Sequence, residues 1–141
     1  MLRVLVPIDG SEVSNRAADR VVRMVEWFRE KPEIHLLNVQ SPVPEGAMRL
    51  IAQKQVESFH REEGEKVLAV ARKRLGKANI TCTHHIGVGE PGPVIASYAR
   101  AKKIDLIVMG TRGHGSLAGV LLGSVATKVI HLAATPVLLV K

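Results

Sequence analysis

The chain has 141 residues, of which 46% are hydrophobic and 3% aromatic, and its formal net charge at pH 7 is +7. This length fits a single domain spanning residues 1–141, and the apolar content excludes an intrinsically disordered chain. A basic balance attracts anions. However, the charges are dispersed along predicted helices and few aromatic residues could stack on bases, so we expect no nucleic-acid partner.

The cysteine content and the length of the apolar runs bear on where in the cell the protein is expected to act. Cys82 is the only cysteine, so no disulfide can form within the chain, which suits a reducing environment. No apolar run approaches the roughly 20 residues that a membrane-spanning helix needs. The apolar start at residues 2–8 is too short for a secretory signal and contains Arg3 and Pro7. We therefore expect a cytoplasmic protein with no membrane partner.

The first predicted strand covers residues 2–8, a short apolar run typical of a strand that is buried on both faces. Apolar side chains then recur at spacings of three and four over residues 13–28, which predicts an amphipathic helix that ends before Pro32. Residues 34–39 predict a second strand.

The middle of the chain predicts a loop, a long helix and an edge strand. Residues 41–46 contain two prolines and a glycine, which are typical of a loop. Helical spacing follows from about residue 47 to residue 75, where Gly64 can bend the helix and Gly76 is the expected stop. Residues 80–86 alternate between apolar and polar, which indicates a strand with one wet face.

The last third predicts two helices and two strands. Residues 87–92 predict a turn, and Pro93 suits the first turn of a short helix. Residues 110–122 are rich in glycine and predict irregular structure. The remaining elements are a buried strand, a helix and a final strand, at residues 104–109, 124–134 and 137–140.

Strands and helices alternate along the whole chain. This order predicts an α/β fold, a single doubly wound domain with a parallel sheet and helices on both faces. In such sheets a ligand binds beyond the carboxyl ends of the strands, where the strand order reverses. The loops that begin at Asp9, Gln40, Gly87 and Gly110 are available there.

The final strand, Val137 to Val140, is apolar throughout, although its place in the chain order puts it at a sheet edge. A bare apolar edge invites pairing with another chain, so we expect a homodimer through this strand. The alternative is an edge covered by the chain's own helices.

A glycine-spaced segment, Gly110 to Ser124, follows a predicted strand and leads into a predicted helix. Free backbone amides and the helix dipole favour an anion at a helix N-terminus, and glycines let the main chain approach a ligand closely. The segment therefore suits phosphate. Arg112 and His114 could add positive charge, or could be solvated side chains.

Three known nucleotide motifs do not fit this chain. A P-loop needs a lysine where Ser116 stands, so its contact with the β/γ-phosphates is missing. The dinucleotide fingerprint is matched locally by Gly113, Gly115 and Ala118, but these follow the fourth strand and no acidic residue lies about twenty residues further on. The HxGH signature of nucleotidyl transferases lacks its second histidine at residues 85–88.

A longer glycine spacing, G-x2-G-x9-G-[ST], does match, with Gly110, Gly113, Gly123 and Ser124. Three further strings accompany it: Val-Pro-Ile-Asp-Gly-Ser at 6–11, Ile-Val-Met-Gly-Thr-Arg-Gly at 107–113 and Thr-Pro-Val-Leu-Leu-Val at 135–140. With these strings the chain resembles the ATP-binding branch of the universal stress protein family over essentially its whole length.

The resemblance implies a five-stranded sheet of order 3-2-1-4-5, a homodimer through the last strand, and ATP as cofactor. A Mg²⁺ ion that bridges the phosphates can accompany the ATP. The resemblance also implies which residues contact the nucleotide from the adenine end to the phosphates. These are Pro7, Ile8, Asp9 and Val39, then Met109 and Gly110, then Gly113, Gly123, Ser124 and Val125. We add Arg112 to the expected contacts for the positive charge that it could bring to the phosphates.

Some of these positions have a simpler alternative role. Asp9 could accept hydrogen bonds from ribose hydroxyls or help to hold a metal, or it could only cap the first helix. Ser124 could cap the last helix, which is compatible with a phosphate contact. Ala126 stands where family members often have a hydroxyl residue, and Thr127 is adjacent to it.

We expect no protein metal site and no catalytic residues. His84 and His85 are neighbours on a strand and point to opposite faces, so they cannot chelate one ion together. A magnesium ion that bridges phosphates needs few protein ligands. Neither Ser116 nor Ser124 has an adjacent base with an orienting acid, which leaves at most slow ATP hydrolysis.

Three functions therefore compete. The first is a dimeric ATP-binding module in a stress response, and the second is a slow ATPase or phosphotransferase. A binder of another adenine nucleotide, AMP or cyclic AMP, is a variant of the first. The third is a nucleic-acid-interacting protein. The missing P-loop lysine favours the first over the second, and the low aromatic content disfavours the third.

Overall fold

The computed structural model describes residues 1–48, 50–114, 119 and 121–141. It contains one sheet of five parallel strands in the order β3-β2-β1-β4-β5. The strands are β1 (Arg3–Pro7), β2 (Glu33–Gln40), β3 (Cys82–Val88), β4 (Leu106–Gly110) and β5 (Val137–Val140). The predicted fold class and strand order are thereby confirmed.

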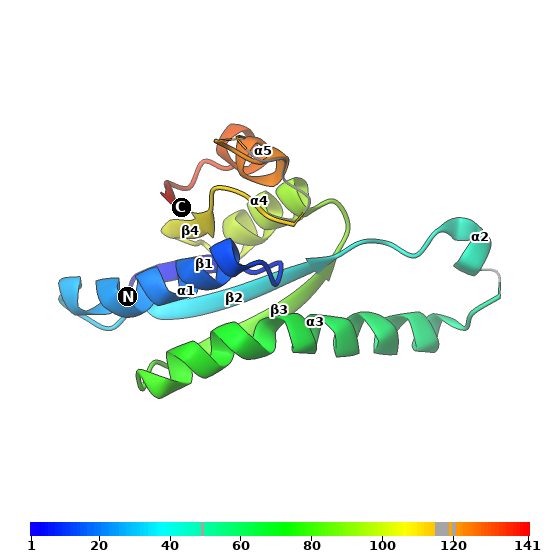
Figure 1. The fold of residues 1–141 in the computed structure, drawn as a ribbon, viewed down its shortest axis with the longest axis horizontal. Coiled ribbons are helices and arrows are strands. Elements are labelled where there is room, and N and C mark those ends of the chain that lie inside the picture. Colours follow the sequence, from blue (N-terminus) through cyan, green and yellow to red (C-terminus); the bar gives the residue numbers. More distant parts are fainter. Residues whose placement is uncertain (49, 115–118, 120) are drawn as a thin grey trace.

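Helices cover both faces of this sheet (Figure 1). Helices α1 (Glu12–Met24) and α3 (Gln53–Lys77) pack on one face, and α4 (Pro91–Ala101) and α5 (Ser124–Leu132) pack on the other. The short α2 (Glu45–Met48) projects from the body of the molecule on the connection between β2 and α3.

The central strand β1 supplies side chains to both hydrophobic cores. Val4 and Val6 belong to the core under α1 and α3, whereas Leu5 belongs to the core under α4 and α5. In the register of the sheet, Val4 lies between Ile34 of β2 and Leu106 of β4. Because both faces are covered, this strand is an uninterrupted apolar run rather than an alternating one.

The two edge strands are less buried. Side chains of β3 alternate between partly buried and exposed from Cys82 to Ile86, as the sequence pattern predicts for an edge. Strand β5 pairs with β4, and residues 137–139 are partly buried. Within the part of the chain that the structure describes, no second strand pairs with β5.

Several helix boundaries differ from the predicted ones, and among them α5 ends at Leu132 rather than at residue 134. The helix expected at residues 47–75 is divided into α2 and α3, and the amide of Ala52 at the start of α3 donates to Gln55 Oε1 at 3.3 Å. Helix α4 begins at Pro91, inside the turn predicted at residues 87–92, because β3 extends to Val88, and Pro93 lies in the first turn of the helix as predicted. Helix α1 ends at Met24 and continues as a single 3-10 turn.

The predicted stop of the long helix at Gly76 is wrong by a few residues. Asn79 takes the left-handed conformation, with φ of 56°, and the amide of Ile80 donates to the carbonyl of Leu75 at 3.0 Å. This arrangement satisfies the last carbonyls of a helix, and asparagine is one of the residues that tolerate it. Asn79 therefore ends α3, and Gly76 lies within the helix.

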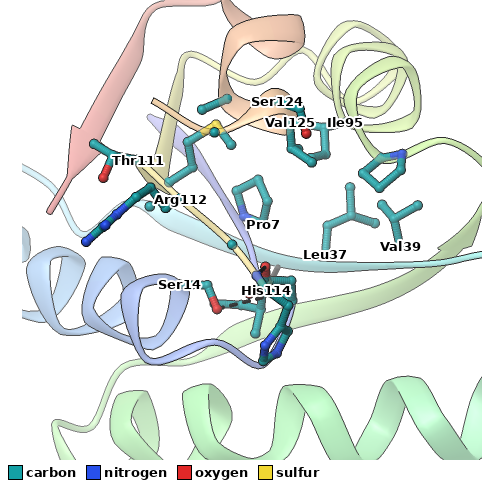
Figure 2. A pocket seen from close by; sticks show the side chains of 18 of the residues that line it. Pro7, Ser14, Leu37, Val39, Ile95, Thr111, Arg112, His114, Ser124 and Val125 are labelled. Atoms are coloured by element: carbon teal, nitrogen blue, oxygen red, sulfur yellow. Dashed lines mark hydrogen bonds between the residues drawn. The ribbon is translucent and has the colours of Figure 1, made fainter. Parts of the chain in front are cut away.

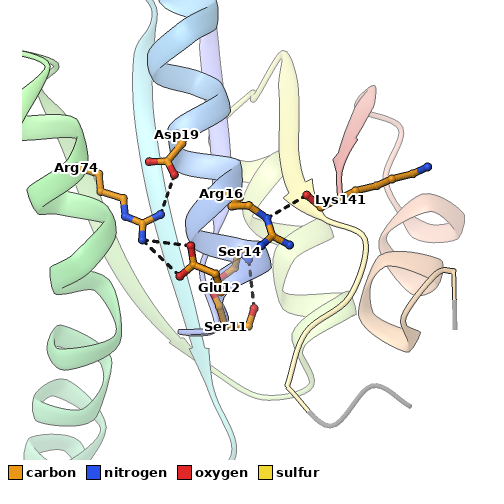
Figure 3. Close-up of polar contacts among 7 residues, drawn as sticks. All are labelled: Ser11, Glu12, Ser14, Arg16, Asp19, Arg74 and Lys141. Atoms are coloured by element: carbon orange, nitrogen blue, oxygen red, sulfur yellow. Dashed lines mark hydrogen bonds and ion pairs between the residues drawn. The ribbon is translucent and has the colours of Figure 1, made fainter. Parts of the chain in front are cut away.

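Polar contacts fix α1 between α3 and the end of the sheet (Figure 3). The guanidinium of Arg74 on α3 donates to Asp19 at 2.8 Å and to Glu12 at 3.4 Å, both on α1. From the same helix, Arg16 Nε donates to the carbonyl of Lys141 at 3.1 Å. These bonds join three segments that lie far apart in the sequence.

No helix among the described residues has the length and apolar character that crossing a membrane requires.

Gly64 lets α3 pack closely on β3. A Cβ atom at this position would lie 2.6 Å from both Cγ1 and Cδ1 of Ile86 and 2.9 Å from its Cγ2. Gly64 is buried, and contacts this short force the neighbouring side chain or the helix to move. The absence of a side chain at Gly64 thus allows the short distance between α3 and β3. At Gly76, in the same helix, a Cβ atom would have no neighbouring atom within 4 Å.

We predict that Gly64→Ala lowers the free energy of unfolding by about 1 kcal/mol, because overpacking outweighs the gain in helix propensity. Gly76→Ala, the same change on the exposed side of the same helix, should instead be neutral or stabilising by up to about 1 kcal/mol. Urea unfolding measures both values. Ile86→Ala removes the Cγ1, Cγ2 and Cδ1 atoms of this side chain, so Gly64→Ala should cost much less in the Ile86→Ala background than in the parent, and an equal cost in both backgrounds would contradict the steric explanation.

Candidate functional site

A cavity of about 350 Å³ opens at the carboxyl ends of the central strands. Strand β1 has β2 on one side and β4 on the other, so the order of strands reverses here. The loops after β1, β2 and β4 and the N-terminal turns of α4 and α5 form its walls. This is the place at which ligands bind in open α/β sheets.

All eleven residues predicted from the sequence line this one cavity. They come from three strand ends and from the start of α5: Pro7, Ile8, Asp9, Val39, Met109, Gly110, Arg112, Gly113, Gly123, Ser124 and Val125. Their convergence is a property of the structure, whereas their contact with a nucleotide stays a prediction.

The cavity has an apolar side and a polar side (Figure 2). Leu37 and Val39 from β2 and Ile95 from α4 lie together on one side. Thr111 and Arg112, which follow β4, lie on the other side. An apolar wall that faces a few polar groups is the usual character of a small-molecule site.

The carboxylate of Asp9 connects the end of β1 to the glycine-rich loop. Its Oδ1 accepts hydrogen bonds from the amide of Ser11 at 2.9 Å and from the Ser11 hydroxyl at 2.5 Å. Its Oδ2 accepts a hydrogen bond from the amide of His114 at 3.1 Å. Asp9 thus connects the loop after β1 to the loop after β4 at the entrance of the cavity.

The hydrogen bonds also determine the charge of Asp9. The surrounding protein partly desolvates the carboxylate, which by itself raises its pKa, but the hydrogen bonds from Ser11 and His114 outweigh this and lower the pKa below the ordinary value of 3.8. A carboxylate with a lowered pKa stabilises the folded state at higher pH and loses this effect as the pH falls through the lowered value. The connection through Asp9 therefore persists at neutral pH and is released only in acid.

Asp9 is not the cap of the first helix. The N-cap of α1 is Ser11, whose Oγ accepts a hydrogen bond from the amide of Ser14 at 3.2 Å (Figure 3). Asp9 instead accepts a hydrogen bond from the hydroxyl of Ser11 and thereby orients the residue that caps the helix. The capping alternative for Asp9 is therefore wrong, and its contact with a ligand remains a prediction.

Two glycines of the matched spacing are required by the protein's own packing. A Cβ at Gly113 would collide with Oδ2 of Asp9. A Cβ at Gly110 would lie 2.7 Å from Cγ1 of Val13 on α1. At these positions the glycines therefore let β4 and its loop approach β1 and α1, whether or not a ligand is bound.

The N-terminus of α5 faces the cavity. Gly123 is the N-cap residue, with φ of −74° and ψ of 165°, and its amide donates to the carbonyl of Thr111 at 2.7 Å. Ser124 is the first residue of the helix and is exposed, so it does not cap α5 as the alternative proposed. The amides of the first helical turn have no partner within the helix and are available to an anion.

Thr127 does not replace the hydroxyl that is missing at Ala126. Its Oγ1 donates to the carbonyl of Gly123 at 2.9 Å, one turn back in the same helix, and Thr127 is not part of the cavity lining. Ala126 itself lines the cavity.

Several lining residues were not predicted from the sequence. They are Ser14, Leu37, Ser41, Pro91, Ile95 and Thr111. Leu37 lies two residues before Val39 on the same face of β2, so strand periodicity could have identified it. Ile95 appears in the sequence only as part of an apolar helix face, and the packing of α4 beside β2 brings it to the cavity.

The histidines behave as strand geometry predicts. His84 Nε2 lies 2.9 Å from Glu65 Oε1 on α3, whereas the ring of His85 lies 5.4 Å from that of Tyr98 on α4. The two neighbours thus face opposite sides of the sheet. Across the described ranges, no three of the His, Cys, Asp and Glu side chains gather as metal ligands would.

Part of the glycine-rich segment is not among the described residues. Residues 115–118 and 120 lie outside the described residues, and with them Gly115, Ser116 and Ala118 of the motif comparisons.

Comparisons with known proteins agree with this architecture. The Universal stress protein MJ0531 of Methanocaldococcus jannaschii is 36% identical over 143 residues, which cover 99% of this chain and 81% of that protein. The solved structure of MJ0577, from the same organism, has a TM-score of 0.83 at 28% identity and covers 99% of this chain and 95% of its own.

A second solved structure, a universal stress protein in complex with cAMP, has a TM-score of 0.74 at 28% identity and covers 99% of this chain and 97% of its own. The family model described as Universal stress protein family matches residues 1–141. A match over the full length, together with a relative above 30% identity, shows that this chain belongs to the universal stress protein family.

Proposed function

We propose that this chain is an ATP-binding universal stress protein that acts as a homodimeric binding module rather than as an enzyme. The observation that carries the proposal is the cavity at the reversal of strand order, where an apolar wall faces the N-terminus of α5. In this proposal the nucleotide alters the shape of the protein or its affinity for a partner in a stress response. We further propose that it acts in the cytoplasm.

The two sides of the cavity suit the two ends of a nucleotide. Adenine is flat and largely apolar, and the space beside Leu37, Val39 and Ile95 offers apolar contacts together with the backbone of Val39. Asp9 and Pro7 lie at the end of β1, between this wall and the loop after β4, where a ribose would lie. Phosphates would then reach Gly113, Gly123 and Ser124, where amides of a helix N-terminus meet them.

The cavity offers few protein ligands for a magnesium ion. Asp9 is the one carboxylate among the described residues of the cavity lining, and both of its oxygens already accept hydrogen bonds. A magnesium ion would therefore be held mainly by the phosphates, with Asp9 as a single protein ligand. When bound, it would neutralise phosphate charge.

The same cavity suits other adenine nucleotides, because the features that accept the base and the first phosphate do not depend on the number of phosphates. A relative of this chain has been solved in complex with cAMP. Mass spectrometry of the small molecule that copurifies with the protein, followed by calorimetry with ATP, AMP and cAMP, ranks these ligands. Tight binding of none of the three would overturn the nucleotide proposal.

We predict that Gly123→Val weakens ATP binding about 100-fold, a change of about 2.7 kcal/mol. The backbone angles of Gly123 are open to any residue, so valine causes no backbone strain there and acts through the bulk it adds beside the phosphates. Isothermal titration calorimetry gives the affinity, and thermal unfolding verifies the fold. Gly76→Val, on the far end of α3, is the matched control, and parental ATP affinity in Gly123→Val would contradict the assignment of this loop.

The dimer is predicted to form through β5. Leu139→Asp places a charge on β5, a half-buried strand whose outer edge pairs with no other strand among the described residues, so it should shift the protein to monomers. Light scattering after size exclusion measures the mass. Val70→Asp on exposed α3 is the control and should leave the dimer intact. A Leu139→Asp protein that stays folded and dimeric would reject this interface.

A further inference from the structure

A second cavity, of about 550 Å³, lies at the other end of the sheet, where the parallel strands begin. Arg3 at the start of β1 and Glu33 at the start of β2 line it, and the last turn of α4 with Lys102 and Lys103 forms another wall. The first cavity shares none of these residues. The proposed nucleotide function therefore leaves this cavity without a role.

A chain of hydrogen-bonded side chains lines the cavity. His35 is buried, with 6% of its surface exposed, and its Nε2 lies 2.9 Å from Oε1 of Glu33. Its Nδ1 lies 2.9 Å from the hydroxyl of Tyr98 on α4. Arg3 Nε donates to the other oxygen of Glu33 at 3.2 Å.

The charge of Glu33 determines the direction of these bonds. Desolvation by itself raises the pKa of Glu33. The hydrogen bond from Arg3 and the interactions with His35 outweigh desolvation and lower the pKa below its ordinary value, so Glu33 is ionised. An ionised carboxylate only accepts hydrogen bonds, and Nε2 of His35 must therefore carry a proton. Burial and the charge of Glu33 raise the pKa of Tyr98, which keeps its hydroxyl protonated.

The protonation of His35 then controls the hydroxyl of Tyr98. When His35 is neutral, Nδ1 is an acceptor and the Tyr98 proton is donated to it. When His35 takes up a second proton, Nδ1 becomes the donor. The Tyr98 oxygen accepts this bond, and its own O–H becomes available to a ligand in the cavity.

Cationic side chains line the same cavity as the Tyr98 hydroxyl. Lys102 and Lys103 are exposed, and within the described ranges neither forms an ion pair. Arg3 also lines the cavity, but it is paired with Glu33, the one carboxylate among the described lining residues, so the two lysines supply the positive charge that remains for a ligand. The neighbouring carbonyls of α4 are also occupied: that of Tyr98 accepts the amide of Lys102 at 2.9 Å.

Lys103 takes a conformation that lysine seldom adopts. Its φ is 52°, in the left-handed region directly after α4, where glycine or asparagine is usual. After α3 the same position is held by Asn79, as expected. The left-handed conformation of a lysine costs of order 1 kcal/mol, and it places Lys103 directly after the helix, at the rim of the cavity.

We propose that this second cavity binds a small tetrahedral dianion, the phosphate group of a phosphorylated metabolite or free phosphate, held by Lys102 and Lys103 and by the Tyr98 hydroxyl that protonation of His35 releases. Binding is thereby coupled to proton uptake. The titratable and charged groups that line the cavity with His35 are Glu33 on its own strand, Arg3 on β1, His84 and His85 on β3, and Tyr98, Lys102 and Lys103 at the end of α4. Of the two β3 histidines, His84 is paired with Glu65 on α3.

Sulfate and inorganic phosphate are suitable probes, and the histidine ring signals are the reporters. Titration of labelled protein, followed by nuclear magnetic resonance, should shift the His35 and His85 signals in a saturable way. Sulfate keeps its charge between pH 5.5 and 7.5, and it should raise the pH midpoint of the His35 ring signals by roughly 0.5 to 1 unit, a three- to tenfold coupling. His114, at the first cavity, reports any binding there separately.

Two variants test the assigned contacts. Lys102→Gln with Lys103→Gln should weaken binding of sulfate roughly tenfold, whereas Lys73→Gln with Lys77→Gln, the same charge change on α3, should leave it nearly unchanged. Tyr98→Phe keeps the ring and should abolish the shift of the His35 midpoint while thermal unfolding remains parental.

Three results would overturn the proposal. The first is equal loss of binding in both double-lysine variants, which would indicate only general charge attraction. The second is a His35 midpoint that does not respond to sulfate. The third is saturable binding of an oligonucleotide, but of neither small anion, at these signals. Comparison of free phosphate with a sugar phosphate then identifies the source of the bound group, since only a metabolite site prefers the ester.

Discussion

The pairing of β1 on both sides, with β2 and with β4, is the constraint on which the rest of the molecule depends. Parallel strands need crossover connections, and the hand of these connections is fixed. Helices α1 and α3, which lead the chain from β1 outward to β3, therefore cover one face. Helices α4 and α5, which lead it from β3 to β4 and β5, cover the other. At the carboxyl end of β1, the loops after β1 and β4 therefore lead to opposite faces of the sheet, and the cavity lies between these two loops.

The walls of this cavity are positioned by the protein itself. Asp9 holds the amide of His114 and the hydroxyl of Ser11, so the loop after β4 is joined to the loop after β1 without a ligand. The close approach of these loops excludes any side chain at Gly113, and the packing of α1 excludes one at Gly110. The glycines of a pattern that resembles a phosphate-binding motif are therefore also required by the packing of the protein itself. Both requirements act on the same residues, because a loop that approaches a phosphate closely must approach its own strand closely as well.

The two ends of the sheet have different chemistry. At the carboxyl end, backbone amides and one carboxylate surround an apolar slot. At the amino end, cationic side chains surround a buried imidazole that bridges a carboxylate and a phenol. Strand β2 reaches both ends, with Glu33 and His35 at one and Val39 at the other. A single rigid strand therefore connects the two cavities, and each is built from residues that the other does not use.

The sequence by itself determined the order of the elements, the buried central strands, the two edges and the strand ends at which a ligand would lie, because periodicity and glycine spacing are local properties that the chain carries into any fold. It also identified eleven residues that line the site at three strand ends and at the start of α5, but it missed Ser41 after β2 and Thr111 after β4. Only the tertiary structure decided the break between α2 and α3, the role of Asn79 as the stop of α3, and the use of Asp9 as a connection rather than a cap. It alone brought Ile95 to the first cavity and joined Glu33, His35 and Tyr98 at the second. These features depend on contacts between residues that are distant in the chain, and no local pattern records which distant side chain a residue will meet.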